Sequence, residues 1–291
     1  MSSNVLKSHK KKISEEVKDM CAQIIKGKQD LTYLSWSLIR NSSGTAGSFL
    51  KSYSELSGKK IYYKLSNFDK LLGVIGHECV NEIIVDRLLE ILGIPHLEYQ
   101  LIHADVLLDG HVREVYLCAS DDFKKKGESK VALDAYQASL QRNDISALDF
   151  CIEQGWEEYI YQMLVVDFLI LNRDRHGANI EVLRDSRRKS LRLAPLFDHG
   201  LSLLFNCKEA DLASFDVMAD RTCNNYIGSQ STLENLKLIP HDKQPHFDNL
   251  REDDKQVLLA DLDGIISEPL QEKIWEMIWK RYCYYMEFCE K

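Results

Sequence analysis

The sequence predicts an α+β fold in two parts, with a small sheet-and-helix part first and a larger, mostly helical part after it. Up to about residue 118, alternating apolar residues indicate several strands around one helix. From residue 119 on, helical spacing dominates, and the last segment, 268–291, has the pattern of a helix rich in aromatic residues. We therefore assign residues 1–118 to the first part and residues 119–291 to the second.

The individual elements follow from periodicity and from turn residues. A helix over 76–94 should end at Gly93, because glycine readily takes the left-handed conformation that terminates helices. The Asp109–Gly110 pair predicts a hairpin turn between two strands. The other elements expected in the first part are a helix over 13–26, a strand over 31–40, a small-residue loop over 41–50 and a strand over 59–66. In the second part we expect helices over 146–156 and 157–171, short strands over 179–185 and 191–197, and mostly helix after that.

Composition limits the class of protein. With 291 residues, 45% of them hydrophobic and 28% charged, the chain is typical of a soluble globular protein. Its net charge of −8 argues against direct nucleic-acid binding, which needs a basic face. The eight cysteines form no C-x-x-C pair, which favours free thiols in a reducing compartment. The start of the chain has no apolar signal core and no apolar run is long enough for a bilayer, so we expect a cytoplasmic protein without membrane insertion.

Three features of the first part suit a phosphate site. The loop Ser43, Gly44, Thr45, Ala46, Gly47 and Ser48 lies between two predicted strands, where glycines let backbone N–H groups approach phosphate oxygens. Lys64, at the end of a strand, could neutralise phosphate charge, although such a lysine is more often solvated. Glu82, in the predicted helix, could orient Lys64 or could compensate the helix dipole, and Glu78 is a rival for the first role.

The second part contains a dense polar cluster after an apolar helix. Asp174 and Asn179 have the D-x-x-x-x-N spacing of kinase catalytic loops, in which the aspartate accepts a hydroxyl proton and the asparagine binds a divalent cation. Asp198 follows the apolar segment 191–197 directly and precedes His-Gly, a position suited to a carboxylate that joins metal to phosphate. Mg²⁺ prefers such hard oxygen ligands and binds few protein groups.

Each feature alone has an ordinary structural explanation, and their order along the chain is what favours a function. A small-residue loop, a strand lysine, a helix glutamate, the Asp174–Asn179 pair and then Asp198 follow the order of kinase parts. We therefore hypothesise ATP- and Mg²⁺-dependent phosphoryl transfer to a hydroxyl. Residues 115–119, including Tyr116, Leu117 and Cys118, are expected from their position to hold adenine through their backbone.

The same residues carry a family resemblance. The segment N-x-D-x-H-x-x-N (Asn172, Asp174, His176, Asn179), followed by L-A-P-L-F-D (193–198), resembles HipA-like serine/threonine kinases, whose fold is shared with phosphatidylinositol 3/4-kinases. The likeness extends in patches over 36–205, with Lys64 and Glu82 at the matching places. The short segment before residue 36 is similar to the compact form of the family, which lacks an extra N-terminal subdomain.

The resemblance implies specific roles. Asp174 would be the catalytic base, Asn179 and Asp198 the Mg²⁺ ligands and Lys64 the ATP phosphate contact, while Asn172 and His176 would support the loop. Members of the family can phosphorylate their own Gly-rich loop, which makes Ser42, Ser43, Thr45 and Ser48 candidate sites. The substrate would be a hydroxyl-bearing partner, a protein first. A small-molecule or lipid-headgroup kinase, or a nucleotide-binding regulatory module without catalysis, remains an alternative.

The sequence leaves the roles of two groups of charged residues undecided. Arg173 and Arg175 flank Asp174 and could meet substrate, but solvated arginines are about as common. Lys124, Lys125 and Lys126 could recognise an acidic substrate, although a charge run is more often a solvated face.

Overall fold

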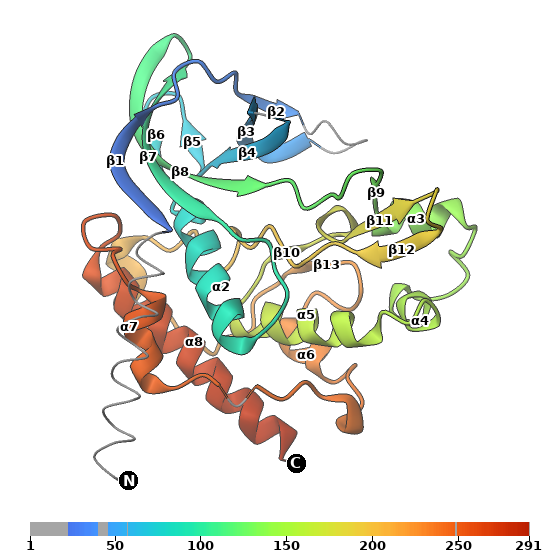
Figure 1. Ribbon diagram of the computed structural model, residues 1–291. Coiled ribbons are helices and arrows are strands. Elements are labelled where there is room, and N and C mark those ends of the chain that lie inside the picture. The colour runs from blue at the N-terminus through green and yellow to red at the C-terminus, as the bar shows by residue number, and fades with distance from the viewer. Residues whose placement is uncertain (1–22, 40–45, 57, 248, 291) are drawn as a thin grey trace, which may run out of the picture. The chain divides into compact units, whose positions relative to one another are not determined.

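The computed structural model describes residues 23–39, 46–56, 58–247 and 249–290, and Figure 1 shows their helices and strands. The described chain forms two compact units. Apart from the gaps just given, the first comprises residues 23–93, 98–122 and 249–272, and the second comprises 94–97, 123–247 and 273–290. The lobe boundary predicted at residue 119 stays a prediction; the units differ from the predicted spans chiefly because 249–272 belong to the first.

The first unit is built on a six-stranded sheet with the order β1-β7-β8-β4-β3-β2. Neighbouring strands are antiparallel except β1 and β7, which are parallel. The strands are β1 (Ile24–Asp30), β2 (Ser37–Ile39), β3 (Ala46–Leu56), β4 (Lys59–Leu65), β7 (Gln100–Leu108) and β8 (His111–Asp121), with the small pair β5 (Phe68–Asp69) and β6 (Gly73–Val74) beside them.

The predicted hairpin around Asp109–Gly110 is confirmed. Both turn residues have positive φ, 49° and 80°, as a two-residue turn that follows the twist of the strands requires. Leu108 and His111 pair at the mouth of the turn, and the ladder continues to Gln100 and Ala119. Side chains from β4, β7 and β8 form a buried apolar core on the sheet.

The predicted helix that ends at Gly93 is also confirmed. Helix α2 (Glu78–Leu92) ends at Gly93, which has φ 68° in the left-handed region. The helix contacts strands β4, β7 and β8, and nearly all its residues are buried. Its Arg87 is fully buried and donates to the carbonyl oxygens of Leu258 and Ala260 at 3.0 and 2.8 Å, beside α7 (Lys255–Leu258). This contact fixes part of the C-terminal segment to the first unit.

His77, the residue before α2, predicts a pH dependence of stability. Burial lowers the pKa of His77 to about 4. The unfolded chain binds a proton below about pH 6.5, whereas the folded chain does so only near pH 4, so stability is lost as the pH falls through this window. Acidification from pH 7.5 to pH 4.5 should cost about 3 kcal/mol through this residue. The measurement is the free energy of unfolding in urea for wild type and His77→Asn, and an equal pH dependence of the two proteins would contradict the prediction.

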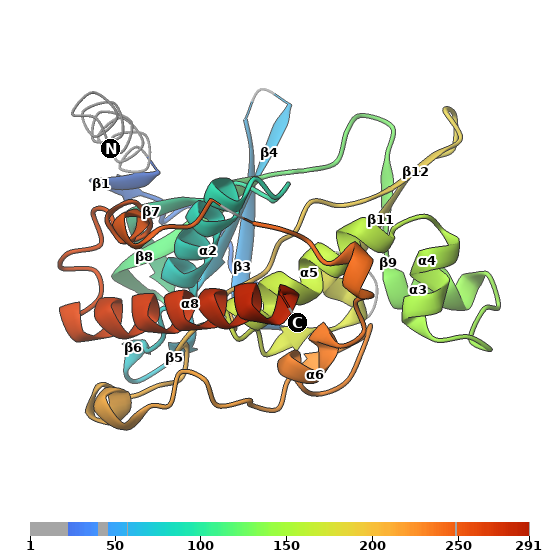
Figure 2. The same cartoon turned by 90° about the horizontal axis from the view of Figure 1, so that it is seen from below.

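The second unit combines helices with small sheets. A three-stranded sheet has the order β12-β11-β9, and two short strands, β10 and β13, pair in parallel. Helix α3 lies beside β9 and contacts α4, and α5 packs with α6 (Figure 2). The strands are β9 (Ser129–Ala132), β10 (Asp174–Arg175), β11 (Glu181–Asp185), β12 (Ser190–Leu193) and β13 (Asn224–Asn225). The helices are α3 (Leu133–Ser139), α4 (Ala147–Glu153), α5 (Glu157–Leu169) and α6 (Thr232–Leu236), with α8 (Glu268–Cys289) extending from the first unit.

Arg281 of α8 ties that helix to α5. Its guanidinium donates to the carbonyl oxygens of Phe168, Val217 and Ala219 at 2.8–3.0 Å, and burial lowers its pKa to about 10. None of the helices in the described part of the chain combines the length and apolarity that a bilayer span requires.

Three predictions about local structure are wrong. Residues 24–26 are not helical, because Ile24 and Ile25 pair in parallel with Leu101 and Ile102 of β7, and sheet pairing overrides the helical spacing; residues 13–22 lie outside the described residues. Of the strand predicted over 31–40, only 37–39 is β2. The chain after residue 199 is mostly irregular, with short α6 and α7 and the 3₁₀ turns η2 (Glu209–Ser214), η3 (His241–Lys243) and η4 (Glu252–Asp254) before α8.

The last of these errors has a local cause. Asn and Asp side chains bind nearby backbone N–H groups and so favour turns over helix. Asn225 accepts from the N–H groups of Ile227 and Gly228, and Asp216 accepts from that of Met218, at 2.9–3.0 Å.

Candidate active site

Lys64 and Glu82 form a buried ion pair in the first unit. The Nζ atom of Lys64, on β4, lies 2.8 Å from Oε1 of Glu82, on α2, and the side chains are 10% and 0% exposed. The Phe49 ring centroid lies 4.9 Å from the same Nζ. A buried charge needs a partner, and α2 supplies it from the face that packs on the sheet.

Glu78 has a different task. Its carboxylate accepts from the backbone N–H of Asn67 at 3.0 Å, and Ser66 Oγ accepts from the N–H of Cys79 at 2.9 Å, so both residues organise the start of α2. A Cβ atom at Gly76 would lie 2.1 Å from the Glu78 carboxylate, so a larger residue there would displace that carboxylate. In this structure the partner of Lys64 is therefore Glu82.

The different roles of Glu82 and Glu78 predict unequal effects of Glu82→Gln and Glu78→Gln. If the ion pair serves catalysis, Glu82→Gln should lower the rate of phosphoryl transfer by about 10- to 100-fold, because a charge-assisted hydrogen bond contributes about 1.5–3 kcal/mol. Glu78→Gln should leave the rate within about threefold and change only stability. Steady-state ATPase or peptide kinase assays with both proteins test this, and equal rates for the two variants would remove Glu82 from the site.

Two buried thiols adjoin Lys64 and were missed from the sequence. The Sγ atoms of Cys79 and Cys118 donate to the Lys64 carbonyl oxygen at 3.1 and 3.8 Å. The neighbouring Cys79 side chain, together with burial, raises the pKa of Cys118 well above its ordinary value. Cys118 lies directly opposite Lys64 in the β4–β8 ladder.

The adenine contacts expected at Tyr116, Leu117 and Cys118 stay a prediction, and the sheet pairing of β8 bears on it. All three lie inside β8, whose backbone pairs with β7 on one side and, at Leu117 and Cys118, with β4 on the other. A backbone whose N–H and C=O groups are used in the sheet has none left for a base. The Tyr116 side chain stacks on His103, with ring centroids 4.8 Å apart. The pairing of β8 with β7 ends at Ala119, and Ser120 and Asp121 pair with β4.

The predicted Gly-rich loop is only partly described. Strands β2 and β3 pair antiparallel, with Ile39 opposite Ala46. Ser42, Ser43, Gly44 and Thr45 lie outside the described residues. Ala46, Gly47 and Ser48 belong to β3 rather than to a loop, and the pairing of β3 with β2 is irregular between Ala46 and Lys51.

In the second unit, α5 ends just before the polar cluster. Leu171 has φ 51°, in the left-handed region where glycine usually ends a helix. The N–H of Asn172 donates to the Asp167 carbonyl oxygen at 2.9 Å, which closes the helix end. A leucine in this conformation costs about 1–2 kcal/mol, so the surrounding contacts must hold it.

The Asp174 carboxylate is held from two sides and is partly open to solvent. Its Oδ1 accepts from Nδ2 of Asn224 at 3.1 Å, its Oδ2 lies 3.6 Å from Nε2 of His176, and the side chain is 25% exposed. The Oδ1 of Asn172 accepts from the Asp174 N–H at 3.2 Å, while its Nδ2 donates to Asp167. Both predicted supporting residues thus contact the loop. Asn224 had no sequence signal, since it comes from β13, which pairs with β10.

Arg175 is neither solvated nor placed to meet substrate. Arg175 and Asp167 form an ion pair at 2.9 Å with side chains 1% and 2% exposed. The Nη1 atom of Arg175 donates to the carbonyl oxygens of both Asn179 and Phe197, at 3.3 and 3.0 Å. One guanidinium therefore brings the predicted metal ligand Asn179 next to the residue that precedes Asp198.

Asn179 and Asp198 have the chemistry expected of Mg²⁺ ligands. Nδ2 of Asn179 donates to the Asp174 carbonyl oxygen at 2.9 Å, which orients the amide and makes Oδ1 the atom that could bind a metal. Asp198 has φ 60°, a conformation that aspartate tolerates better than most residues. Within the described ranges, no three His, Cys, Asp or Glu side chains cluster as a metal site. One amide and one carboxylate oxygen fit a metal held largely by phosphate and water.

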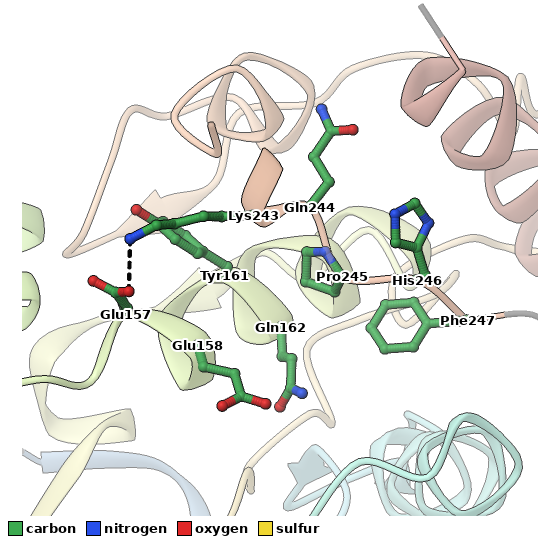
Figure 3. A pocket seen from close by; sticks show the side chains of 9 residues that line it. All are labelled: Glu157, Glu158, Tyr161, Gln162, Lys243, Gln244, Pro245, His246 and Phe247. Atoms are coloured by element: carbon green, nitrogen blue, oxygen red, sulfur yellow. Dashed lines mark hydrogen bonds and ion pairs between the residues drawn. The ribbon is translucent and has the colours of Figure 1, made fainter. Parts of the chain in front are cut away.

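A cavity of about 410 Å³ in the second unit lies apart from these residues in the chain (Figure 3). Two of its lining residues, Lys243 and Glu157, form an ion pair of 2.7 Å, and the Gln244 side chain points away from α5. None of the predicted site residues lines it. The lining consists of Glu157, Glu158, Tyr161, Gln162, Lys243, Gln244, Pro245, His246 and Phe247.

Comparison with known proteins decides the fold. No protein-family model and no curated protein matches the sequence. The structure of the proinflammatory kinase CtkA from Helicobacter pylori aligns over 90% of this chain and 96% of that one, with a TM-score of 0.63 and 15% identity. The chain has a kinase-like fold. The predicted α+β kinase-like class is thereby confirmed.

Two further structures match with lower scores. The HipA–HipB–operator DNA complex from Shewanella oneidensis aligns over 86% of this chain and 60% of that chain, at 15% identity and a TM-score of 0.38. WaaP in complex with acyl carrier protein aligns over 89% of each chain, at 13% identity and a TM-score of 0.36. The fold assignment rests on the first of the three structures alone.

Proposed function

We propose that this protein is an ATP- and Mg²⁺-dependent kinase of the HipA-like serine/threonine type that phosphorylates a protein hydroxyl. The observation that carries the proposal is the double hydrogen bond of Arg175 to Asn179 and Phe197, because it brings together the two segments that would bind the metal. The kinase-like fold and the Lys64–Glu82 ion pair add the other parts that such an enzyme needs.

In the proposed mechanism, Lys64, oriented by Glu82, would contact ATP phosphate. Oδ1 of Asn179 and the Asp198 carboxylate would hold Mg²⁺. When bound, the metal neutralises charge on the transferred phosphoryl group. Asp174 accepts the proton of the acceptor hydroxyl as its oxygen bonds to the γ-phosphorus and ADP leaves. With Oδ1 turned to Asn224, Oδ2 is the atom that takes this proton.

The test is incubation with ATP and Mg²⁺ followed by intact-mass analysis. A gain of one phosphate mass in wild type, absent from Asp174→Ala, supports a protein kinase. Peptide mapping then shows whether Ser42, Ser43, Thr45 or Ser48 is modified, as autophosphorylation in the Gly-rich loop predicts. ATP loss that a soluble metabolite stimulates, without phosphoprotein, would favour a small-molecule kinase instead. If ATP and Mg²⁺ neither raise the melting temperature nor yield transfer, the proposal fails.

A separate variant tests the metal ligands. Asp198→Ala should lose the part of nucleotide binding that depends on Mg²⁺, while binding in EDTA stays the same, because only a carboxylate that would hold the metal is removed. Titration calorimetry with ATP in the presence and absence of Mg²⁺ measures both the Mg²⁺-dependent binding and the binding without metal. An unchanged Mg²⁺ dependence would remove Asp198 from the metal site.

A further inference from the structure

Basic residues gather at one end of the three-stranded sheet of the second unit. Two turns meet there, the turn before β9 and the β11–β12 turn. A Cβ atom at Gly127, in the first turn, would lie 3.6 Å from the carboxylate of Asp185, which begins the second. The two turns and the adjoining residue of β11 form what we call the basic patch, whose exposed side chains are Lys125, Lys126, Arg184, Arg187, Arg188 and Lys189.

The carboxylates of the same sheet do not offset this charge at the surface. Glu128 pairs with Arg192 and Glu181 with Lys130, at 2.8 and 3.2 Å, so each neutralises a cation outside the patch. Asp185 lies 3.7 Å from Arg188. The three carboxylate side chains are only 6–9% exposed, whereas Arg188 is 75% exposed. The outer surface of the patch is therefore strongly cationic in a chain whose net charge is −8.

The patch is also preorganised. Oδ1 of Asp185 accepts from the backbone N–H groups of Arg187 and Arg188 at 2.9 and 3.1 Å, which fixes the β11–β12 turn. Lys189 completes the turn with φ 52°. On the other strand, Ser129 pairs with Arg184. A surface whose backbone is already ordered loses less entropy when a partner binds.

We propose that the basic patch docks an acidic segment of the protein substrate. Charge complementarity favours an acidic peptide as the partner, because several carboxylates in an extended segment would face the exposed guanidinium and ammonium groups. Single-stranded nucleic acid fits less well, since it is usually bound on exposed aromatic rings. The exposed aromatic side chains of the described chain are Tyr33, Tyr53 and Tyr284, and none lies in this sheet. Calling the partner a substrate rests on the proposed function; the docking surface itself does not.

A binding assay without ATP tests the docking surface alone. A labelled decaglutamate peptide is titrated with the full chain at low and high salt, and a Gly-Ser peptide of equal length is the control. The patch variant carries Lys125→Gln, Lys126→Gln, Arg187→Gln and Arg188→Gln. The matched variant carries Lys208→Gln, Lys237→Gln, Lys243→Gln and Lys280→Gln, which changes net charge equally on the same unit.

Wild type and the matched variant should bind decaglutamate in a salt-dependent way, and the patch variant about tenfold or more weakly, since each exposed ion pair contributes roughly 0.2–1 kcal/mol. Equal binding by the two variants, or equal affinity of wild type for both peptides, would overturn the proposal. Tighter binding of an oligonucleotide of the same charge would overturn it in favour of nucleic acid. If the protein is an active kinase, the patch variant should have a higher KM for a serine peptide with an acidic tail and an unchanged kcat. If the protein does not turn over ATP, the proposed function fails, but the binding of decaglutamate still tests the docking surface.

Discussion

Replacing Asp174 by asparagine is expected to lower the rate of phosphoryl transfer by about 10²- to 10⁴-fold, because the variant cannot accept the proton of the attacking hydroxyl. The substitution keeps the size of the side chain and an oxygen that can still accept from Asn224. The melting temperature and the affinity for ATP with Mg²⁺ should therefore change little. Single-turnover phosphate transfer, compared with nucleotide binding on the same preparations, measures the effect.

The matched control for this variant is Asp144→Asn, at an exposed carboxylate of the same unit that pairs with Arg142 at 3.6 Å. It changes net charge equally and should leave the rate within about twofold, since exposed ion pairs contribute little. If Asp174→Asn kept more than a tenth of the wild-type rate, Asp174 would not be the base. If it also lost ATP binding, its role would be structural.

The largest effect on stability is expected from Asp167→Ala. This change leaves the Arg175 guanidinium buried without its carboxylate and removes an acceptor of Asn172. Loss of one partner of a buried ion pair costs about 3–5 kcal/mol. Equilibrium unfolding in urea measures the cost. Lys280→Ala, which breaks the exposed pair with Glu276, should change the free energy of unfolding by no more than about 0.5 kcal/mol.

A double variant distinguishes charge from packing at this pair. Asp167→Leu combined with Arg175→Met removes both charges and keeps apolar volume, so it should recover part of the stability that Asp167→Ala loses. Because it also removes the hydrogen bonds to Asn179 and Phe197, phosphoryl transfer should stay low. A cost below about 1 kcal/mol for Asp167→Ala would contradict the buried-pair argument.

The sequence predicted the elements whose signals are local. Helix α2 has continuous apolar spacing and a terminal Gly93, and the β7–β8 hairpin has its Asp109–Gly110 turn. The D-x-x-x-x-N spacing likewise located the loop that contains Asp174 and Asn179. In each case the residues that determine the structure lie within a few positions of one another.

The remaining features depend on contacts between distant residues, and no local pattern could reveal them. The parallel pairing of Ile24 with Leu101 made a strand of a segment with helical spacing. Asn224 reaches Asp174 from 50 positions away. From its charge, Arg175 was expected to be solvated or to meet substrate, whereas in the folded chain it is buried against Asp167. The backbone pairing of Leu117 and Cys118 with strands on both sides likewise involves residues far away in the sequence.

The contact of Arg87 with residues near 260 has a consequence for how the protein is made. Arg87 precedes its acceptors Leu258 and Ala260 by 171 and 173 positions. During synthesis from the N-terminus, the ribosome therefore releases nearly the whole second unit before this guanidinium can receive its carbonyl partners. We expect the first unit to reach its native packing only late in translation, when most of the chain has been made. A chain interrupted before residue 258 would leave that arginine without these acceptors.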